Sequence, residues 1–182
     1  MLSFHSRRKG QFGSNYLPDI NVSPKTWLDA WQLVALLLIW ACTATVYAEQ
    51  ETNACIDMAA QHYNIHKEIL NAILSVEGGR TGMKKRNSNG SYDMGPMQIN
   101  SSWLPELRRR GISEYEVAND YCTNILVGTW ILARELRRAG IPPINTAEFW
   151  QTIGRYNSRD PYFSSRYAVR VWHQARYMQL SR

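Results

Sequence analysis

Residues 66–79 read HKEILNAILSVEGG, and their apolar side chains recur at the spacing of one face of an α-helix. The apolar positions are Ile69, Leu70, Ile73, Leu74 and Val76. This periodicity predicts a helix over about residues 66–76. Gly78-Gly79 can end it, because glycine tolerates the left-handed backbone that often follows a helix. The stretch indicates a helical fold class.

Segments on both sides of this helix also have helical patterns. We predict further helices over residues 53–63, 120–139 and 146–156, two that begin near residues 102 and 113, and a last one over residues 161–180. On the first of them, one face is predicted to carry Cys55, Met58, Ala59 and His62. Residues 80–100 have no helical period and predict a long loop or a small irregular sheet. The expected architecture is an α-rich single domain with one prominent loop.

Composition narrows the class of protein. The chain has 182 residues, of which 45% are apolar and 20% charged, and a net charge of +6. This length suits one packed domain and excludes a large multidomain protein, and the apolar content excludes a disordered chain. The positive charge favours an anionic partner.

The N-terminal part is typical of an export signal. A basic segment precedes an apolar run from Leu33 to Val46, and the small residue Ala48 follows. This pattern predicts a secretory signal peptide over residues 1–48, with cleavage after Ala48. The alternative is a retained membrane segment, although a full span needs about 20 apolar residues. Under both interpretations residues 49–182 form an exported domain, periplasmic and either released or tethered to the inner membrane.

Export also explains the odd number of cysteines. Cleavage after Ala48 would remove Cys42 and leave Cys55 and Cys122 as an even pair in an oxidising compartment. We therefore expect a disulfide between Cys55 and Cys122, with two buried free thiols as the alternative.

Glu77 is the main candidate for chemistry. It follows Ile73 by four residues and Leu70 by seven, so it continues the apolar stripe of its helix. A carboxyl group there would be partly desolvated, which raises its pKa toward the range that suits a general acid. The alternative is a glutamate at a frayed helix end that faces solvent.

Several short motifs follow in order: Glu77-Gly78-Gly79, Gly95-x-Met97-Gln98-Ile99-Asn100, Asn124-Ile125-x-x-Gly128, Tyr156-Asn157 and Tyr167-Ala168-x-Arg170-Val171. With them the chain resembles the catalytic domain of soluble lytic transglycosylases over roughly residues 53–171. The resemblance is to the small specialised form that accompanies conjugation, pilus and type III or IV secretion systems. It implies an all-α, lysozyme-like fold.

The resemblance also implies a reaction. The family cleaves the β-1,4 bond between N-acetylmuramic acid and N-acetylglucosamine without a cofactor or metal, and forms a 1,6-anhydro product. Glu77 matches its single acid and base. Met97 and Gln98 match substrate-groove residues, Tyr156 matches an aromatic residue whose hydroxyl approaches the catalytic carboxylate, and Asn157 is its neighbour.

The sequence departs from the family pattern in two places. Many members have serine where this chain has Gly78, so a side-chain hydrogen bond next to Glu77 is missing. Many have Ala-Gly where this chain has Ser158-Arg159, which is expected to place a cation near the cleft.

Two alternative functions stay open. A hydrolytic muramidase would need a second carboxylate, and Asp93 is the nearest candidate, although Asn-Gly-Ser-Tyr-Asp is more typical of a turn that Asp93 caps. A non-catalytic peptidoglycan-binding scaffold is the other. The expected partners are glycan strands and components of a secretion, conjugation or pilus system. Nucleic acid is not expected because the chain is exported, and a membrane only through an uncleaved N-terminal segment.

Other side chains receive weaker predictions. No metal site is expected from His62, His66 or His173, because their spacing to cysteine or acidic residues does not suit ligation. The aromatic residues of the helices are expected in the core, although one exposed ring could stack on a sugar. They are Trp103, Trp130, Trp150 and Trp172.

Overall fold

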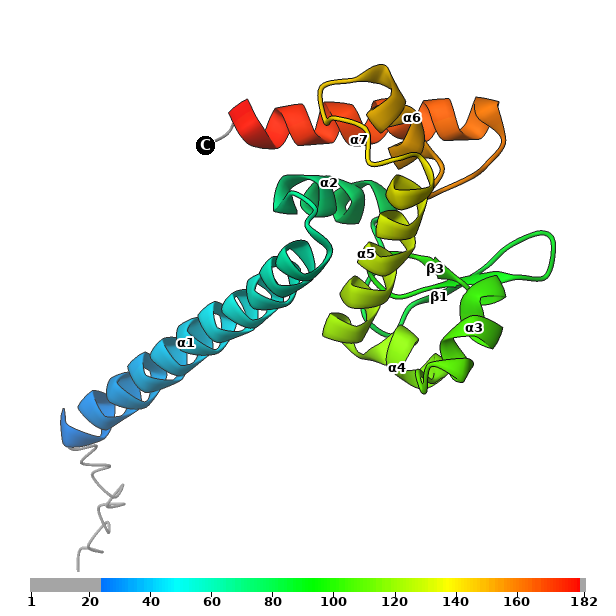
Figure 1. Ribbon diagram of the computed structural model, residues 1–182. Helices are drawn as coiled ribbons and strands as arrows, with labels where there is room; N and C mark the ends of the chain where they lie inside the picture. The colour runs from blue at the N-terminus through cyan, green and yellow to red at the C-terminus, as the bar shows by residue number, and fades with distance from the viewer. Residues whose placement is uncertain (1–23, 181–182) are drawn as a thin grey trace, which may run out of the picture. The chain divides into compact units, whose positions relative to one another are not determined.

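The computed structural model describes residues 24–180 (Figure 1). The chain divides into two units, Met1–Ala44 and Thr45–Arg182. Helix α1 (Pro24–Tyr63) contributes residues to both. The predicted basic segment of the export signal begins at residues that lie outside the described part. Along α1 the apolar side chains from Trp31 to Trp40 that are described are exposed. No helix within residues 24–180 combines the length and the hydropathy needed to cross a membrane.

The second unit is mainly helical, as the sequence predicts. After α1 its helices are α2 (Lys67–Glu77), η1 (Ser101–Trp103), α3 (Leu104–Arg109), α4 (Glu114–Asn119), α5 (Tyr121–Arg138), α6 (Ala147–Gly154) and α7 (Pro161–Leu180). The region between α2 and η1 holds a three-stranded antiparallel sheet, in the order β1 (Lys84–Arg86), β2 (Tyr92–Met94) and β3 (Ile99–Asn100). The prediction of an irregular sheet for residues 80–100 is therefore confirmed.

Side chains at the predicted helix starts account for the helix boundaries. Ser113 and Glu116 form a reciprocal capping box at the start of α4. Asp120 accepts a hydrogen bond from the backbone N–H of Thr123 at 2.6 Å and caps α5. Thr146 caps α6 in the same way. These local bonds are why the helix starts were visible in the sequence.

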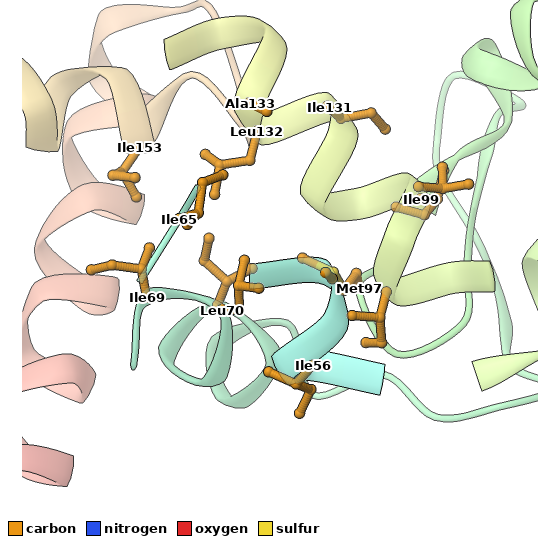
Figure 2. Close-up of a cluster of buried hydrophobic side chains, with 14 of the residues drawn as sticks. Ile56, Ile65, Ile69, Leu70, Met97, Ile99, Ile131, Leu132, Ala133 and Ile153 are labelled. Atoms are coloured by element: carbon orange, nitrogen blue, oxygen red, sulfur yellow. The ribbon is translucent and has the colours of Figure 1, made fainter. Parts of the chain in front are cut away.

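The core lies where α2, α5, α6 and α7 meet. α7 packs against both α2 and α6, and α5 contacts α4, α6 and β3. Figure 1 shows α5 between the α6–α7 pair and the region of the sheet and α4. Ile65, Leu70, Leu132 and Ile153 converge in the cluster of Figure 2, and Leu70, Leu132 and Ile153 are fully buried. Burying such aliphatic side chains contributes about 1.5–3 kcal/mol each.

The buried face of α1 differs from the predicted one. Met58 is 48% exposed and His62 is also exposed. The buried positions are Cys55, Ile56, Ala59 and Ala60. The face is rotated toward Ile56, whose side chain joins the core while that of Met58 faces solvent.

A disulfide joins Cys55 of α1 to Cys122 in the first turn of α5, across 67 positions of sequence. It ties the segment before α2 to the central helix of the unit.

Candidate functional site

A cavity of about 360 Å³ opens at the C-terminal end of α2. Glu77, the last residue of that helix, lines it together with Asp93 of β2, Gln98 before β3, and Tyr156 and Asn157 after α6. Residues of the sheet region and of the segment after α6 therefore surround one carboxyl group, and most of the surface they present is polar.

The carboxyl group of Glu77 is mostly buried and held by a tyrosine. The hydroxyl of Tyr167 on α7 donates a hydrogen bond to Oε1 of Glu77 at 2.5 Å. Burial raises the pKa of Glu77 from 4.5 to about 7, while the Tyr167 hydrogen bond and the charge of Arg170 lower this pKa and the charge of Asp93 raises it. Arg170 is fixed by donating to the carbonyl of Val76 at 2.9 Å. Glu77 is thus neither frayed nor fully solvated, and its carboxyl titrates near neutral pH.

Two tyrosines lie near Glu77, and only Tyr167 bonds its carboxyl group. The Tyr156 hydroxyl donates to the backbone carbonyl of Met97 at 2.8 Å, and no hydrogen bond to Glu77 is recorded for it. Its ring stacks on that of Tyr167, with the ring centroids 6.3 Å apart. Burial raises the pKa of both tyrosines well above 10, so both remain neutral hydrogen-bond donors. The hydroxyl that bonds Glu77 directly is therefore that of Tyr167, while Tyr156 lines the same cavity.

Tyr167 belongs to the motif Tyr167-Ala168-x-Arg170-Val171, for which the sequence predicts no catalytic or binding role. The available signal was its helical spacing to Arg170, which places both side chains near one face of α7. What the sequence could not show is that this face meets the end of α2.

Met97 supports the cavity wall instead of lining the cavity. Its side chain is fully buried against α5, where a Cβ on Gly128 would come within 2.4 Å of the Met97 Sδ. Its backbone N–H donates to Oδ1 of Asn124 at 2.8 Å. The substrate contact expected of the Met97 side chain is thus replaced by a structural role.

Gln98 does line the cavity, on a backbone held in an uncommon conformation. Its φ angle is 49°, and its side-chain Nε2 donates to the carbonyl of Gly95 at 2.8 Å. A Cβ on Gly79 would lie 2.1 Å from this same carbonyl oxygen. The end of α2 can approach the turn at residues 95–98 only because position 79 has no side chain.

Asn124 on α5 is fully buried and holds the turn at residues 95–98 in place through hydrogen bonds. Its Nδ2 donates to the carbonyls of Met94 and Val117, at 3.0 and 2.7 Å. With the bond from Met97 N–H, all three polar contacts are made to backbone groups of other segments. The residue fixes the position of β2 and of the turn that carries Gln98.

Asp93 lies in the cavity instead of capping a turn. It is paired across the sheet with Asn100, whose Nδ2 donates to Oδ1 of Asp93 at 2.7 Å. Asn87 donates to the other oxygen, Oδ2, at 3.0 Å. The expected turn-capping role is wrong, because the residue belongs to β2. The structure thus brings a second carboxylate into the cavity of Glu77.

Trp103 is a further lining residue and is only partly buried. Its ring meets that of Trp130 edge to face, with centroids 5.5 Å apart, and the Arg134 guanidinium lies 5.2 Å from its centroid. Such contacts with a cation and a second ring restrain the orientation of the indole. Both rings pack against the core, as expected, and each keeps an accessible part.

The cation expected near the cleft is engaged elsewhere. Arg159 pairs with the buried carboxylate of Glu135 at 3.1 Å and is absent from the residues that line the cavity. Among the described residues no group of three or more potential ligands could hold a metal ion.

Comparisons with known proteins identify the family of the chain. The family model described as "Transglycosylase SLT domain" matches residues 54–170. "Invasion protein IagB" of Salmonella typhi is 31% identical over 147 residues, which cover 78% of this chain and 84% of that protein. A "Peptidoglycan-binding-like protein" of Escherichia coli O157:H7 is 34% identical over 116 residues, covering 59% of this chain and 65% of the relative. An "X polypeptide" of Escherichia coli is 31% identical over 109 residues, covering 59% and 60%.

Proposed function

The chain belongs to the Transglycosylase SLT domain family, and from this membership we propose a specific reaction. The fold is lysozyme-like and helix-rich, and the function is peptidoglycan-acting, of the lytic transglycosylase type. The protein cleaves the β-1,4 bond between N-acetylmuramic acid and N-acetylglucosamine and leaves a 1,6-anhydromuramic acid end. The observation that carries this proposal is the carboxyl of Glu77, which lies in a polar cavity with a pKa of about 7.

A single carboxyl group of this kind can serve both steps. Protonated Glu77 donates its proton to the glycosidic oxygen, and the C1–O4 bond breaks. The resulting carboxylate then accepts the proton of the muramic acid C6 hydroxyl while O6 forms a bond to C1. Glu77 ends protonated, as it began, and no water is consumed. Tyr167 holds the carboxyl in place throughout through its hydrogen bond to Oε1.

Substrate binding is proposed for the neutral polar groups of the wall. Gln98 and Asn157 offer amide donors and acceptors to sugar hydroxyls and acetamido groups without adding a competing charge. Tyr156 shares this wall, where its hydroxyl secures the Met97 carbonyl. Met97 contributes by positioning these neighbours.

The test compares the wild type with Glu77→Gln on purified peptidoglycan. The wild type is expected to release muropeptides whose masses are one water lower than those of hydrolytic products, and Glu77→Gln is expected to lose at least about 10³-fold in rate. Glu148→Gln, which changes an exposed carboxyl on α6, is the matched control and retains activity. Clearing of peptidoglycan by Glu77→Gln at the wild-type rate would contradict the proposal, and so would a wild type that binds the polymer without cleaving it.

A second candidate is hydrolysis, which the position of Asp93 favours. Retaining and inverting glycosidases place two carboxyl groups on the two sides of the bond, and Asp93 lies in the Glu77 cavity close enough to influence its pKa. Product masses separate the two reactions: full-mass reducing ends from the wild type, lost in Asp93→Asn, would establish a muramidase.

Location and partners are proposed on the same basis. An exported, periplasmic domain suits the peptidoglycan substrate, the Cys55–Cys122 disulfide and the predicted export signal over residues 1–48. The proposed role is to open the wall for a secretion, conjugation or pilus assembly, and one relative is named an invasion protein. A leader peptide would be recognised by N-terminal sequencing of the periplasmic protein, which is expected to begin at residue 49.

A further inference from the structure

A second cavity, of about 320 Å³, lies at the other end of α2. Glu68 in the first turn of α2 lines it, whereas Glu77 at the end of α2 lines the first cavity. The rise of an α-helix, 1.5 Å per residue, places these two positions about 13 Å apart along the helix axis. His66 and Ile69 at the start of α2 also line it, and the other lining residues come from the loop before α6 and from α6 and α7. The two cavities have no lining residue in common.

The walls of this second cavity are largely apolar, and two tryptophans form part of them. Trp150 of α6 and Trp172 of α7 both line it, together with Ile69, Ile144 and Ala175. Trp172 is 36% exposed, so a part of its indole is open to solvent. Indole surfaces beside polar groups suit ligands with one apolar face and several hydroxyls, which is the character of a pyranose ring.

Polar groups at the same cavity have the chemistry of an amino-sugar site. The guanidinium of Arg176 lies 5.2 Å from the Trp172 ring centroid and is held there by a cation–π contact. It can donate to a hydroxyl, to an acetamido carbonyl or to the lactyl carboxylate of muramic acid. The amide of Asn145 both donates and accepts, and the carboxylate of Glu68 accepts. A size of about 320 Å³ is at the lower end for a small-molecule site and fits one sugar unit better than a protein surface.

We propose that this cavity is a second glycan-binding site, which holds an N-acetylated amino sugar of peptidoglycan while the Glu77 cavity acts on another part of the polymer. The proposal rests on the proposed function, since peptidoglycan is the ligand in both. The site increases retention on the cell wall and leaves the chemical step unchanged, because none of its residues reaches the first cavity.

The experiment measures cosedimentation of the full chain with peptidoglycan sacculi, in a Glu77→Gln background so that the polymer is not consumed. Trp172→Ala is expected to weaken binding about three- to tenfold, the loss expected for one aromatic stacking contact. Arg176→Ala is expected to weaken it as well, and Trp172→Phe to restore part of it. Tyr177→Ala is the matched control, because Tyr177 is an exposed aromatic residue on the same helix that does not line this cavity.

Two further readouts separate the outcomes. Chitin, a peptide-free polymer of N-acetylglucosamine, should show the same loss for Trp172→Ala, and a loss confined to peptide-bearing sacculi would overturn the proposal in favour of a stem-peptide site. Equal binding by Trp172→Ala and Tyr177→Ala, at unchanged melting temperatures, would also overturn it.

With Glu77 intact, Trp172→Ala should cleave short soluble glycan fragments at the wild-type rate. A failure of the proposed function appears as absent cleavage in the wild type, independently of the binding measurements.

Discussion

The Glu77 carboxyl is largely buried and accepts a hydrogen bond from the Tyr167 hydroxyl. Burial and this hydrogen bond shift the pKa of the carboxyl in opposite directions. Burial favours the neutral acid and raises the pKa, whereas the Tyr167 hydroxyl stabilises the carboxylate and lowers it. The result, a pKa of about 7, keeps a substantial protonated fraction at neutral pH while leaving a carboxylate that can accept a proton. Activity that depends on the protonated form is lost as the pH rises through this value.

Removing the Tyr167 hydroxyl should therefore change the pH profile. In Tyr167→Phe the carboxylate loses its donor, the pKa of Glu77 rises, and the alkaline limb of the rate profile moves to higher pH. We also expect kcat to fall about tenfold, since a hydrogen bond to a charged group contributes about 1.5–3 kcal/mol. Tyr156→Phe is the control, because its hydroxyl bonds Met97 and not Glu77, and its alkaline limb should stay in place. A limb that moves equally in both variants would contradict the assignment.

The raised pKa also affects stability. The folded state keeps Glu77 protonated up to about pH 7, whereas the unfolded chain releases the proton near its ordinary pKa of 4.5. Because the folded state binds more protons between these values, the contribution of Glu77 to the free energy of unfolding decreases as the pH rises from about 4.5 to 7 and does not change further above pH 7. Glu77→Gln removes this loss, so at pH 8 it should be more stable than the wild type by about 3 kcal/mol.

Urea unfolding measures this difference. The gain should shrink toward zero below about pH 3.5, where the wild-type side chain is protonated in both states. A gain of the same size at both pH values would show that it arises from packing and not from titration.

At the scale of elements, the site depends on the close approach of the end of α2 to the turn at residues 95–98. Gly79 permits the approach, since a Cβ there would lie 2.1 Å from the Gly95 carbonyl oxygen and 2.6 Å from Gln98 Nε2. The adjacent Gly78 has a different reason to be glycine. Its φ of 61° ends the helix in the left-handed conformation, with no other atom near the position of a Cβ.

These two glycines give a matched pair of substitutions. Gly79→Ala forces the turn away from Glu77, and we expect a loss of about 1–3 kcal/mol in stability together with a fall in activity of more than tenfold. Gly78→Ala meets no neighbouring atom and should lose only about 1–2 kcal/mol, through backbone strain alone, with most activity retained. Unfolding curves and turnover of both variants test this. Greater activity in Gly79→Ala than in Gly78→Ala would contradict the close-approach argument.

At the scale of the whole second unit, the Cys55–Cys122 disulfide connects α1 to α5 across 67 positions of sequence. Loop-entropy models give roughly 4 kcal/mol for a loop of this length. The double variant Cys55→Ala/Cys122→Ala should therefore unfold at a lower urea concentration, with about 2–4 kcal/mol lost. Cys42→Ala is the control, because Cys42 lies outside the disulfide. An unchanged midpoint in the double variant would contradict a stabilising role.

The local features of the fold could be predicted from the sequence. Helical patterns predicted α2, α4, α5 and α6, and the side-chain bonds that cap α4, α5 and α6 join residues only three positions apart. The placement of Glu77 on an apolar stripe likewise indicated a desolvated carboxyl, which its raised pKa bears out.

The identity of the groups around that carboxyl was decided only by tertiary structure. Tyr167 contacts Glu77 from 90 positions away, and Tyr156 reaches Met97 from 59. Asp93 enters the cavity because β2 pairs with β3, and not because of any local pattern. Sequence spacing determines which side chains share a face within one element. Which faces meet depends on the packing of α2, α5 and α7 into one core, and that packing placed Tyr167 on the acid and a second carboxylate beside it.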